Sequence, residues 1–174
     1  MTDVKQETWI DKSGWGDGPW QDEPDRVEWT DGEYVCLMLR HPFSGNWCGY
    51  VAVSPGHLWH EVDYSDIHGA HVHGGLTYGD HCMIDTRPLR ERVCHVTESE
   101  DRLWWLGFDC HHAFDFAPGF RARELRMAAK FREEGDVESA ELFERATPRD
   151  TYRTVEYVRN EIAGLVAQAR VAAA

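Results

Sequence analysis

The sequence predicts a single α+β domain in which an antiparallel or mixed sheet packs against C-terminal helices. Apolar runs of strand length lie between residues 33 and 108, and amphipathic helical patterns fill the last third of the chain. Strands followed by helices, rather than alternating with them, are typical of this class. The 174 residues are enough for one hydrophobic core and too few for two of ordinary size.

The first 33 residues differ in composition from the rest of the chain. They hold ten acidic and three basic residues, together with four of the eight tryptophans. The stretch from Ser13 to Trp20 is rich in glycine, serine, aspartate and proline, which are typical of turns. We expect residues 1–33 to form an irregular acidic segment packed on a body formed by residues 34–174, because four indoles in water would expose a large apolar patch. The alternative is an arm that docks on a partner.

Several short apolar runs read as strands. Residues 41–45 contain proline and glycine between two such runs, which predicts a hairpin. The clearest buried strand is 103–108, where bulky apolar side chains point both ways. In chain order, strands are expected at residues 33–40, 46–53, 82–84, 93–96 and 103–108.

Three helices are expected after residue 118. The first covers residues 121–134 and ends at Gly135, the second is capped by Asp136, and the third is capped by Asp150 and runs to about residue 170. In the third helix, apolar residues at helical spacing form one face that should pack on the sheet. These residues are Val155, Val158, Ile162, Leu165, Val166 and Ala169.

Two polar clusters, each beside a β-like run, are the candidate functional residues. The first contains His71, His73 and the pair Gly74-Gly75. In a strand, His71 and His73 would present both imidazoles on one face, because side chains alternate with a period of two. The glycines permit a sharp turn or a close backbone approach.

The second cluster, Asp109-Cys110-His111-His112 with Asp115, follows the predicted strand 103–108. Imidazole and carboxylate groups bind transition metals and transfer protons near neutral pH. We therefore expect His73 and His112 to lie close together with Asp109 beside them. A divalent transition metal (zinc, manganese or iron) held by His73, Asp109, His112 and Asp115 fits this chemistry, with Asp109 or Asp115 as the catalytic base. The alternative is that Asp109 caps the following turn and His112 is a structural histidine.

The five cysteines form no Cys-x-x-Cys pair, which predicts free thiols in a reducing cytoplasm. Two further uses stay open at this point. Cys110 has a histidine beside it and is a possible nucleophile. His81-Cys82 and Cys94-His95 together offer a Cys2His2 ligand set for zinc.

The formal net charge of −13 repels phosphates and anionic membranes, so we expect no direct binding of nucleic acid. No apolar run is long enough to span a bilayer, and the N-terminus has no apolar signal core, so we expect neither a membrane association nor secretion. The expected partner is a small molecule or a basic host protein.

Four stretches of the chain carry a resemblance to a known family. They are Cys48-Gly49-Tyr50-Val51-Ala52-Val53, His73-Gly74-Gly75-Leu76-Thr77, the run from Trp104 to Asp115 and Tyr152-Arg153-Thr154-Val155-Glu156-Tyr157-Val158. In these stretches the chain resembles a family of small proteins, of no established activity, from bacteriophages and their bacterial hosts. The family pattern has a small residue at the place of His111 and glycine at that of Phe114, which leaves His73, Asp109, His112 and Asp115 as the matching polar positions. The resemblance implies a phage-associated protein of the bacterial cytoplasm.

Two functions are compatible with these observations. The His/Asp clusters favour a metal-dependent hydrolase that acts on a small phosphorylated or nucleotide-like molecule. The net charge favours an acidic protein without enzymatic activity that binds and modulates a host protein.

Overall fold

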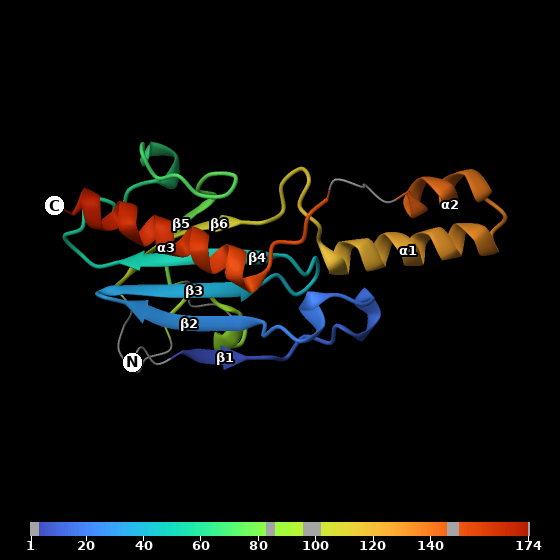
Figure 1. Cartoon of the computed structure of the whole chain (residues 1–174), viewed down its shortest axis with the longest axis horizontal. Coiled ribbons are helices and arrows are strands. Elements are labelled where there is room, and N and C mark those ends of the chain that lie inside the picture. Colours follow the sequence, from blue (N-terminus) through green and yellow to red (C-terminus); the bar gives the residue numbers. More distant parts are fainter. Residues whose placement is uncertain (1–3, 83–85, 96–101, 146–149, 174) are drawn as a thin grey trace.

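Six antiparallel strands form one sheet in the order β1-β2-β3-β4-β6-β5 (Figure 1). The computed structural model describes residues 4–82, 86–95, 102–145 and 150–173. The sheet and three helices confirm the predicted α+β class. The strands are β1 (Lys5–Glu7), β2 (Arg26–Asp31), β3 (Tyr34–Arg40), β4 (Trp47–Val53), β5 (Tyr78–His81) and β6 (Trp104–Asp109).

One face of the sheet packs against helix α3, Val155–Ala172 (Figure 1). Alternate residues of β3 and β4, such as Cys36 and Val51, point to this face and are fully buried or nearly so. The predicted apolar face of the last helix is confirmed. Five of its members are 0% exposed: Val158, Ile162, Leu165, Val166 and Ala169.

The opposite face of the sheet carries a second, smaller core. Its buried residues include Leu37, Tyr50 and Trp105, and partly buried residues such as Val93 and Leu103 pack against them from outside β3, β4 and β6. In the described part of the chain, none of the α-helices contributes a residue to this core. Loop segments exclude water from it instead.

The N-terminal segment is not irregular throughout, because β1 and β2 add to the sheet. β2 pairs with β3 along its whole length, from Arg26 opposite Leu39 to Asp31 opposite Tyr34. Sequence reasoning missed β2 because it lies in a segment whose acidic, turn-rich composition favours irregular chain. Its charged residues Arg26 and Glu28 are buried as an ion pair with 2.7 Å between nitrogen and oxygen.

Glu23 ties this segment to the body. One of its carboxylate oxygens accepts hydrogen bonds from the buried Arg40 guanidinium at 2.7 Å, from the indole nitrogen of Trp47 at 3.2 Å and from the hydroxyl of Tyr152. Trp20 is 6% exposed and stacks on Phe116. Part of the acidity of the segment is therefore used in internal ion pairs.

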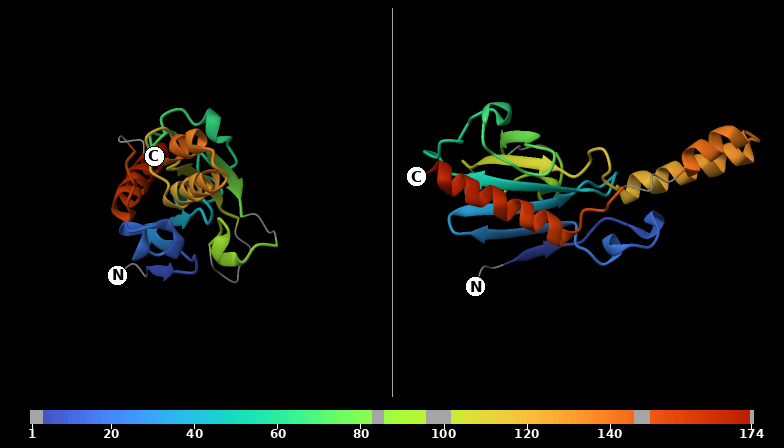
Figure 2. Two further views of the ribbon diagram at one scale, coloured as in Figure 1. Left: turned by 90° about the vertical axis from the view of Figure 1, so that its right-hand side faces the viewer. Right: turned by 45° about the horizontal axis from the view of Figure 1, so that its top comes forward.

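Helices α1 (Pro118–Glu133) and α2 (Val137–Glu144) form a hairpin that projects beyond the end of the sheet (Figure 2). Asp136 caps α2, as predicted, by accepting a hydrogen bond from the Ser139 N–H at 3.0 Å. The predicted cap of the last helix was wrong. Thr154 caps α3, because Thr151 forms a parallel bridge with Asp115 and the chain stays extended up to that point. Short 3₁₀ helices cover Ser13–Trp15, Pro19–Gln21, Tyr64–Asp66 and Leu89–Glu91.

The two short strands expected around Arg87 are not formed by the described residues. Cys82 and residues 93–95 are irregular, while residues 83–85 and 96 lie outside the described ranges. The strand at this edge of the sheet is β5, which precedes them and pairs with β6. No helix in the described ranges is long and apolar enough to cross a bilayer.

The prediction of five free thiols is wrong for one pair. Cys82 and Cys94 form a disulfide with their Cα atoms 4.8 Å apart, whereas Cys36, Cys48 and Cys110 are free. The pair is twelve residues apart in sequence and meets because the chain turns back after β5. Spacing alone does not reveal such a contact.

Candidate acid–base site

A polar stripe on α3 holds the segment that carries His73. Tyr157, Glu161 and Gln168 are spaced at helical intervals beside the buried apolar face. Glu161 accepts a hydrogen bond from the His73 backbone N–H at 2.8 Å. The Gln168 amide bonds to the backbone N–H and carbonyl of His71 at 2.5 and 2.9 Å.

These hydrogen bonds to α3, and not a strand, position His71 and His73. Both residues lie in irregular chain, so the period-two argument does not apply to them. His71 is exposed and bonds to α3 through its backbone, whereas the His73 side chain is only 13% exposed. Of the two imidazoles, the structure brings only that of His73 into the site.

Asp115 is the buried centre of the site. Its side chain is 0% exposed. One oxygen accepts a hydrogen bond from Arg153 Nε at 2.8 Å, and the other accepts from the His112 backbone N–H at 3.0 Å and bonds to His73 Nε2 at 2.7 Å. Burial opposes ionisation, but the bonds from Arg153, His73 and His112 outweigh it and leave the pKa of Asp115 below its usual value. Asp115 is therefore a carboxylate at neutral pH.

The charge on Asp115 decides where the proton of His73 lies. A carboxylate accepts and cannot donate, so Nε2 of His73 carries the hydrogen that points at Asp115. When the ring carries this one proton, Nδ1 is an acceptor, and the Tyr157 hydroxyl, 3.0 Å away, is the donor to it. Burial raises the pKa of Tyr157, with a further contribution from Glu161, so the phenol keeps its proton at neutral pH. Asp115, His73 and Tyr157 thus form one directional hydrogen-bond chain.

His112 lies beside this chain without joining it. Its ring centroid is 5.5 Å from that of His73, and its Nε2 is 3.9 Å from the nearer oxygen of Asp109. Nε2 is buried and has no hydrogen-bond partner within the described part of the chain. An unpaired buried nitrogen costs free energy unless something else satisfies it.

Gly74 makes this position of His112 possible. A Cβ at residue 74 would lie 1.9 Å from Nε2 of His112, and the backbone there has φ +67°, which favours glycine. Glycine is therefore needed at residue 74 because the His112 ring lies against the backbone there.

Asp109 fulfils the capping role that the sequence left as an alternative. One of its oxygens accepts from the His111 N–H at 3.0 Å, and the other accepts from the Thr77 hydroxyl at 2.9 Å. Asp109 therefore joins the end of β6 to the segment before β5.

The four predicted ligands gather in one region, but their lone pairs are largely occupied. Both oxygens of Asp115 and both ring nitrogens of His73 make hydrogen bonds. Among the described residues, no group of three or more His, Cys, Asp and Glu is arranged to hold a metal ion. A transition metal here stays a prediction.

The two other uses of cysteine are not supported by the geometry. Burial raises the pKa of Cys110 well above that of a free thiol, and the residue is 1% exposed, so it is a poor nucleophile. Cys82 and Cys94 are oxidised, and a disulfide sulfur is not a thiolate ligand.

A pocket of about 510 Å³ adjoins the site between the loop after β6 and the helical hairpin. His112 and Asp115 line it on the side of the site. Two aromatic residues, Phe114 and Phe120, are 55% and 42% exposed, and both line this pocket. The exposed Arg145 also lines it.

Sequence reasoning missed three residues of the site: Arg153, Tyr157 and Glu161. Arg153 and Tyr157 belong to the stretch from Tyr152 to Val158 on which the family resemblance partly rests, but no sequence spacing connects them with His73. The available signal was the polar stripe beside the apolar face of α3, since Tyr157 and Glu161 are four residues apart. Comparisons of the chain with protein families, with curated proteins and with solved structures find no match.

Proposed function

We propose that this protein is a hydrolase that works by acid–base catalysis at the Asp115–His73–Tyr157 chain. The observation that supports this is the engagement of both ring nitrogens of His73, one by a buried carboxylate and the other by a phenol. A histidine oriented by a carboxylate is the usual device for moving a proton near neutral pH. The Tyr157 oxygen is the end of the chain from which a proton reaches a substrate.

The reaction runs through the phenol. The Tyr157 oxygen takes a proton from an attacking water while its own proton passes to His73 Nδ1. Asp115 stabilises the imidazolium that forms. The water oxygen bonds to the electrophilic acyl or phosphoryl centre, and the bond to the leaving group breaks. The proton then returns along the same chain to the leaving oxygen.

The adjoining pocket is the proposed place of the substrate. Phe114 and Phe120 offer faces on which a ring can stack, and Arg145 offers a cation for a phosphate. A small phosphorylated or nucleotide-like molecule fits this combination. In this proposal the substrate is bound in the pocket beside His112 and Asp115, and its reacting group extends from there to the Tyr157 oxygen.

The metal-dependent form of this proposal has a separate test. If zinc, manganese or iron at His73, Asp109, His112 and Asp115 supplied the nucleophile, chelation would abolish hydrolysis and the metal would restore it. The hydrogen bonds already made by His73 and Asp115 favour the metal-independent route. Binding of a basic host protein rests on net charge alone, and several acids of the N-terminal segment pair internally, such as Glu23 with Arg40 and Glu28 with Arg26.

The test is hydrolysis of p-nitrophenyl acetate, p-nitrophenyl phosphate and bis-p-nitrophenyl phosphate by the purified protein. Tyr157→Phe removes one hydroxyl, and His73→Gln removes the imidazole. Each should lower kcat/KM by about 100-fold or more, as expected for loss of a general acid–base group. Addition of EDTA to the native protein should leave the rate unchanged.

Tyr64→Phe is the matched control, because Tyr64 is 37% exposed and lies outside the site. Circular dichroism and thermal melting verify that each variant is folded. A native protein that hydrolyses none of the three esters, or variants as active as Tyr64→Phe, would refute the proposal. A rate lost with EDTA and recovered with zinc would replace it by the metal-dependent form.

A further inference from the structure

A second pocket lies on the face of the sheet opposite α3, away from the acid–base site. Its volume is about 250 Å³. The floor consists of side chains of β3 and β4, with Tyr78 of β5 beside them, and the segment after Cys82 contributes Arg87, Glu91 and Val93. The members from the two strands are Leu39, Arg40, Cys48 and Tyr50.

Three aromatic side chains contribute to the lining. Trp9, Tyr50 and Tyr78 all contribute, and the rings of Tyr50 and Tyr78 meet edge to face with centroids 5.4 Å apart. Edge and face contacts of this kind also suit a bound ring. An apolar cavity of about 150 Å³ is enough to bind benzene, so this pocket has room for one ring with a substituent.

The thiol of Cys48 and the phenol of Tyr50 are neutral polar groups in the floor. Burial raises the pKa of Cys48 to about 12, and burial also raises the pKa of Tyr50 well above its usual value. The thiol and phenol therefore offer hydrogen bonds without charge. Arg87 and Glu91 contribute one charge of each sign, and the charge of Arg40 is paired with Glu23 and Asp25, which leaves the lining without a net preference for an anion or a cation.

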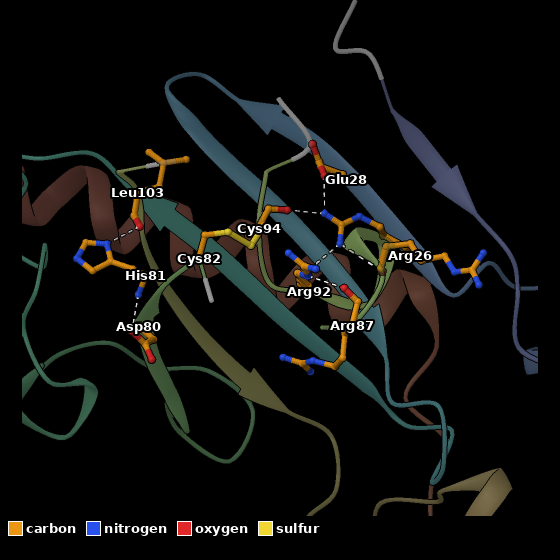
Figure 3. The surroundings of a disulfide bond; sticks show 10 residues. Arg26, Glu28, Asp80, His81, Cys82, Arg87, Arg92, Cys94 and Leu103 are labelled. Carbon is orange, nitrogen blue, oxygen red and sulfur yellow. Dashed lines mark hydrogen bonds and ion pairs between the residues drawn. A yellow bond between two sulfur atoms is a disulfide. The ribbon is translucent and has the colours of Figure 1, made fainter. Parts of the chain in front are cut away.

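Two kinds of contact hold the segment that closes this pocket. The Cys82–Cys94 disulfide joins its ends. The buried Arg26 guanidinium donates to the carbonyls of Arg92 at 2.8 Å and Cys94 at 2.6 Å, and it also pairs with Glu28 (Figure 3). In the described residues of this segment, the only regular element is the short 3₁₀ helix Leu89–Glu91. Its position therefore depends on side-chain anchors more than on sheet pairing.

We propose that this pocket binds a small molecule with a single aromatic ring, and that the Cys82–Cys94 disulfide controls the binding. Oxidised, the pair holds residues 87–93 in place over the sheet, so the pocket is preorganised. In the reduced protein the segment keeps its Arg26 contacts but loses the covalent link between its ends. Part of the binding free energy is then used to order the segment, which weakens the affinity. In the reducing cytoplasm that the sequence predicts, disulfides are most often transient and catalytic or redox-sensing, which suits this role.

The reductant is a dithiol. Its thiolate attacks Cys82, which is partly exposed, because Cys94 is 0% exposed. The attack forms a mixed disulfide and releases Cys94 as a thiolate, which takes up a proton. The second thiol of the reductant then closes its own disulfide and releases Cys82. Two electrons pass from the dithiol to the cysteine pair.

Phenol is the probe, titrated into ¹⁵N-labelled protein while the indole N–H signal of Trp9 is followed by NMR. Trp9→Phe assigns that signal. The oxidised protein should show a saturable shift, and the dissociation constant should rise at least tenfold after dithiothreitol treatment and in Cys82→Ser/Cys94→Ser. All titrations are run below the melting temperature of the double variant.

Cys36→Ala is the matched control, since it removes a buried thiol on the α3 side of the sheet and leaves the disulfide intact. It should bind phenol as the native protein does. No saturable shift at Trp9 would overturn the binding site. Equal affinity in the oxidised and reduced proteins, or five reactive thiols in the unreduced unfolded chain, would overturn the redox control.

Discussion

Gly74 shows how a residue without a side chain determines the position of a catalytic candidate. The His112 ring occupies the space that a Cβ of residue 74 would need, and Gly75, the next residue, has open space around its own Cβ position. Both glycines have positive φ, of 67° and 89°. A side chain at either position would strain the backbone, but only a side chain at residue 74 would also clash with the His112 ring.

Gly74→Ala should displace His112 and lower the free energy of unfolding by more than Gly75→Ala does. Backbone strain at positive φ costs about 1–3 kcal/mol at either position. Only residue 74 adds the clash, so the difference between the two variants reports the contact with His112. Urea denaturation gives both free energies. Equal losses in the two variants would show that His112 does not lie over Gly74.

At this scale, sequence reasoning could find the titratable groups but not their partners. His73, His112 and Asp115 were identified because few residue types transfer protons near neutral pH. Arg153 and Tyr157 were not assigned to the site, because they lie more than 35 residues from Asp115 or His73 along the chain and only the packing of α3 brings them near. Asp109 was expected to be a ligand or base, and its hydrogen bonds are those of a turn cap.

At the scale of elements, α3 has two adjacent functions. One face buries apolar side chains against the sheet, and the polar stripe beside it binds the His71–His73 segment. The first function fixes the rotation of the helix, so it also aims Tyr157 and Glu161 at His73. Stability and site geometry are therefore coupled through one helix.

Ile162→Ala should lower the free energy of unfolding by about 2–5 kcal/mol, the usual cost of truncating a fully buried large side chain. Ile162 is 0% exposed. Val171→Ala on the same helix is the control, because Val171 is 78% exposed and should cost less than about 0.5 kcal/mol. Chemical denaturation measures both. A loss for Ile162→Ala as small as that of the control would mean that this face of α3 is not packed.

The elements that the sequence predicted well are those with an uninterrupted apolar pattern. β3, β4, β6 and α3 have such patterns, and each lies within a few residues of its expected place. β2 was missed because it lies in a segment whose acidic, turn-rich composition favours irregular chain, and its charged residues Arg26 and Glu28 are neutralised by each other inside the fold. β5 was missed because Tyr78–His81 is short and polar and forms only by pairing with β6.

At the scale of the whole molecule, buried ion pairs link stability to pH. The pKa of Asp115 is lower in the folded protein than in the unfolded chain, so the carboxylate stabilises the fold above its unfolded pKa of about 3.9. That stabilisation is lost as the pH falls through the lower, folded pKa. Protonation removes the charge that holds Arg153 and His73 together.

Asp115→Asn should therefore be less stable than the native protein at pH 7, and the gap should shrink as the pH falls below about 4. Urea unfolding from pH 7 to pH 3 measures the gap for the pair of proteins. Because both carry the same remaining carboxylates, general acid destabilisation cancels in the difference. A gap of the same size at pH 7 and pH 3 would contradict an ionised Asp115.

Side-chain ¹⁵N NMR of the His73 imidazole tests the proposed proton chain most directly. In protein labelled with ¹⁵N at histidine, and with His73 assigned through His73→Gln, we expect a single tautomer at pH 7.5. Nε2 should carry the proton and Nδ1 should have the shift of a hydrogen-bonded acceptor that changes in Tyr157→Phe. A proton on Nδ1, or rapid averaging of the two tautomers, would contradict a chain that runs from Asp115 through His73 to Tyr157.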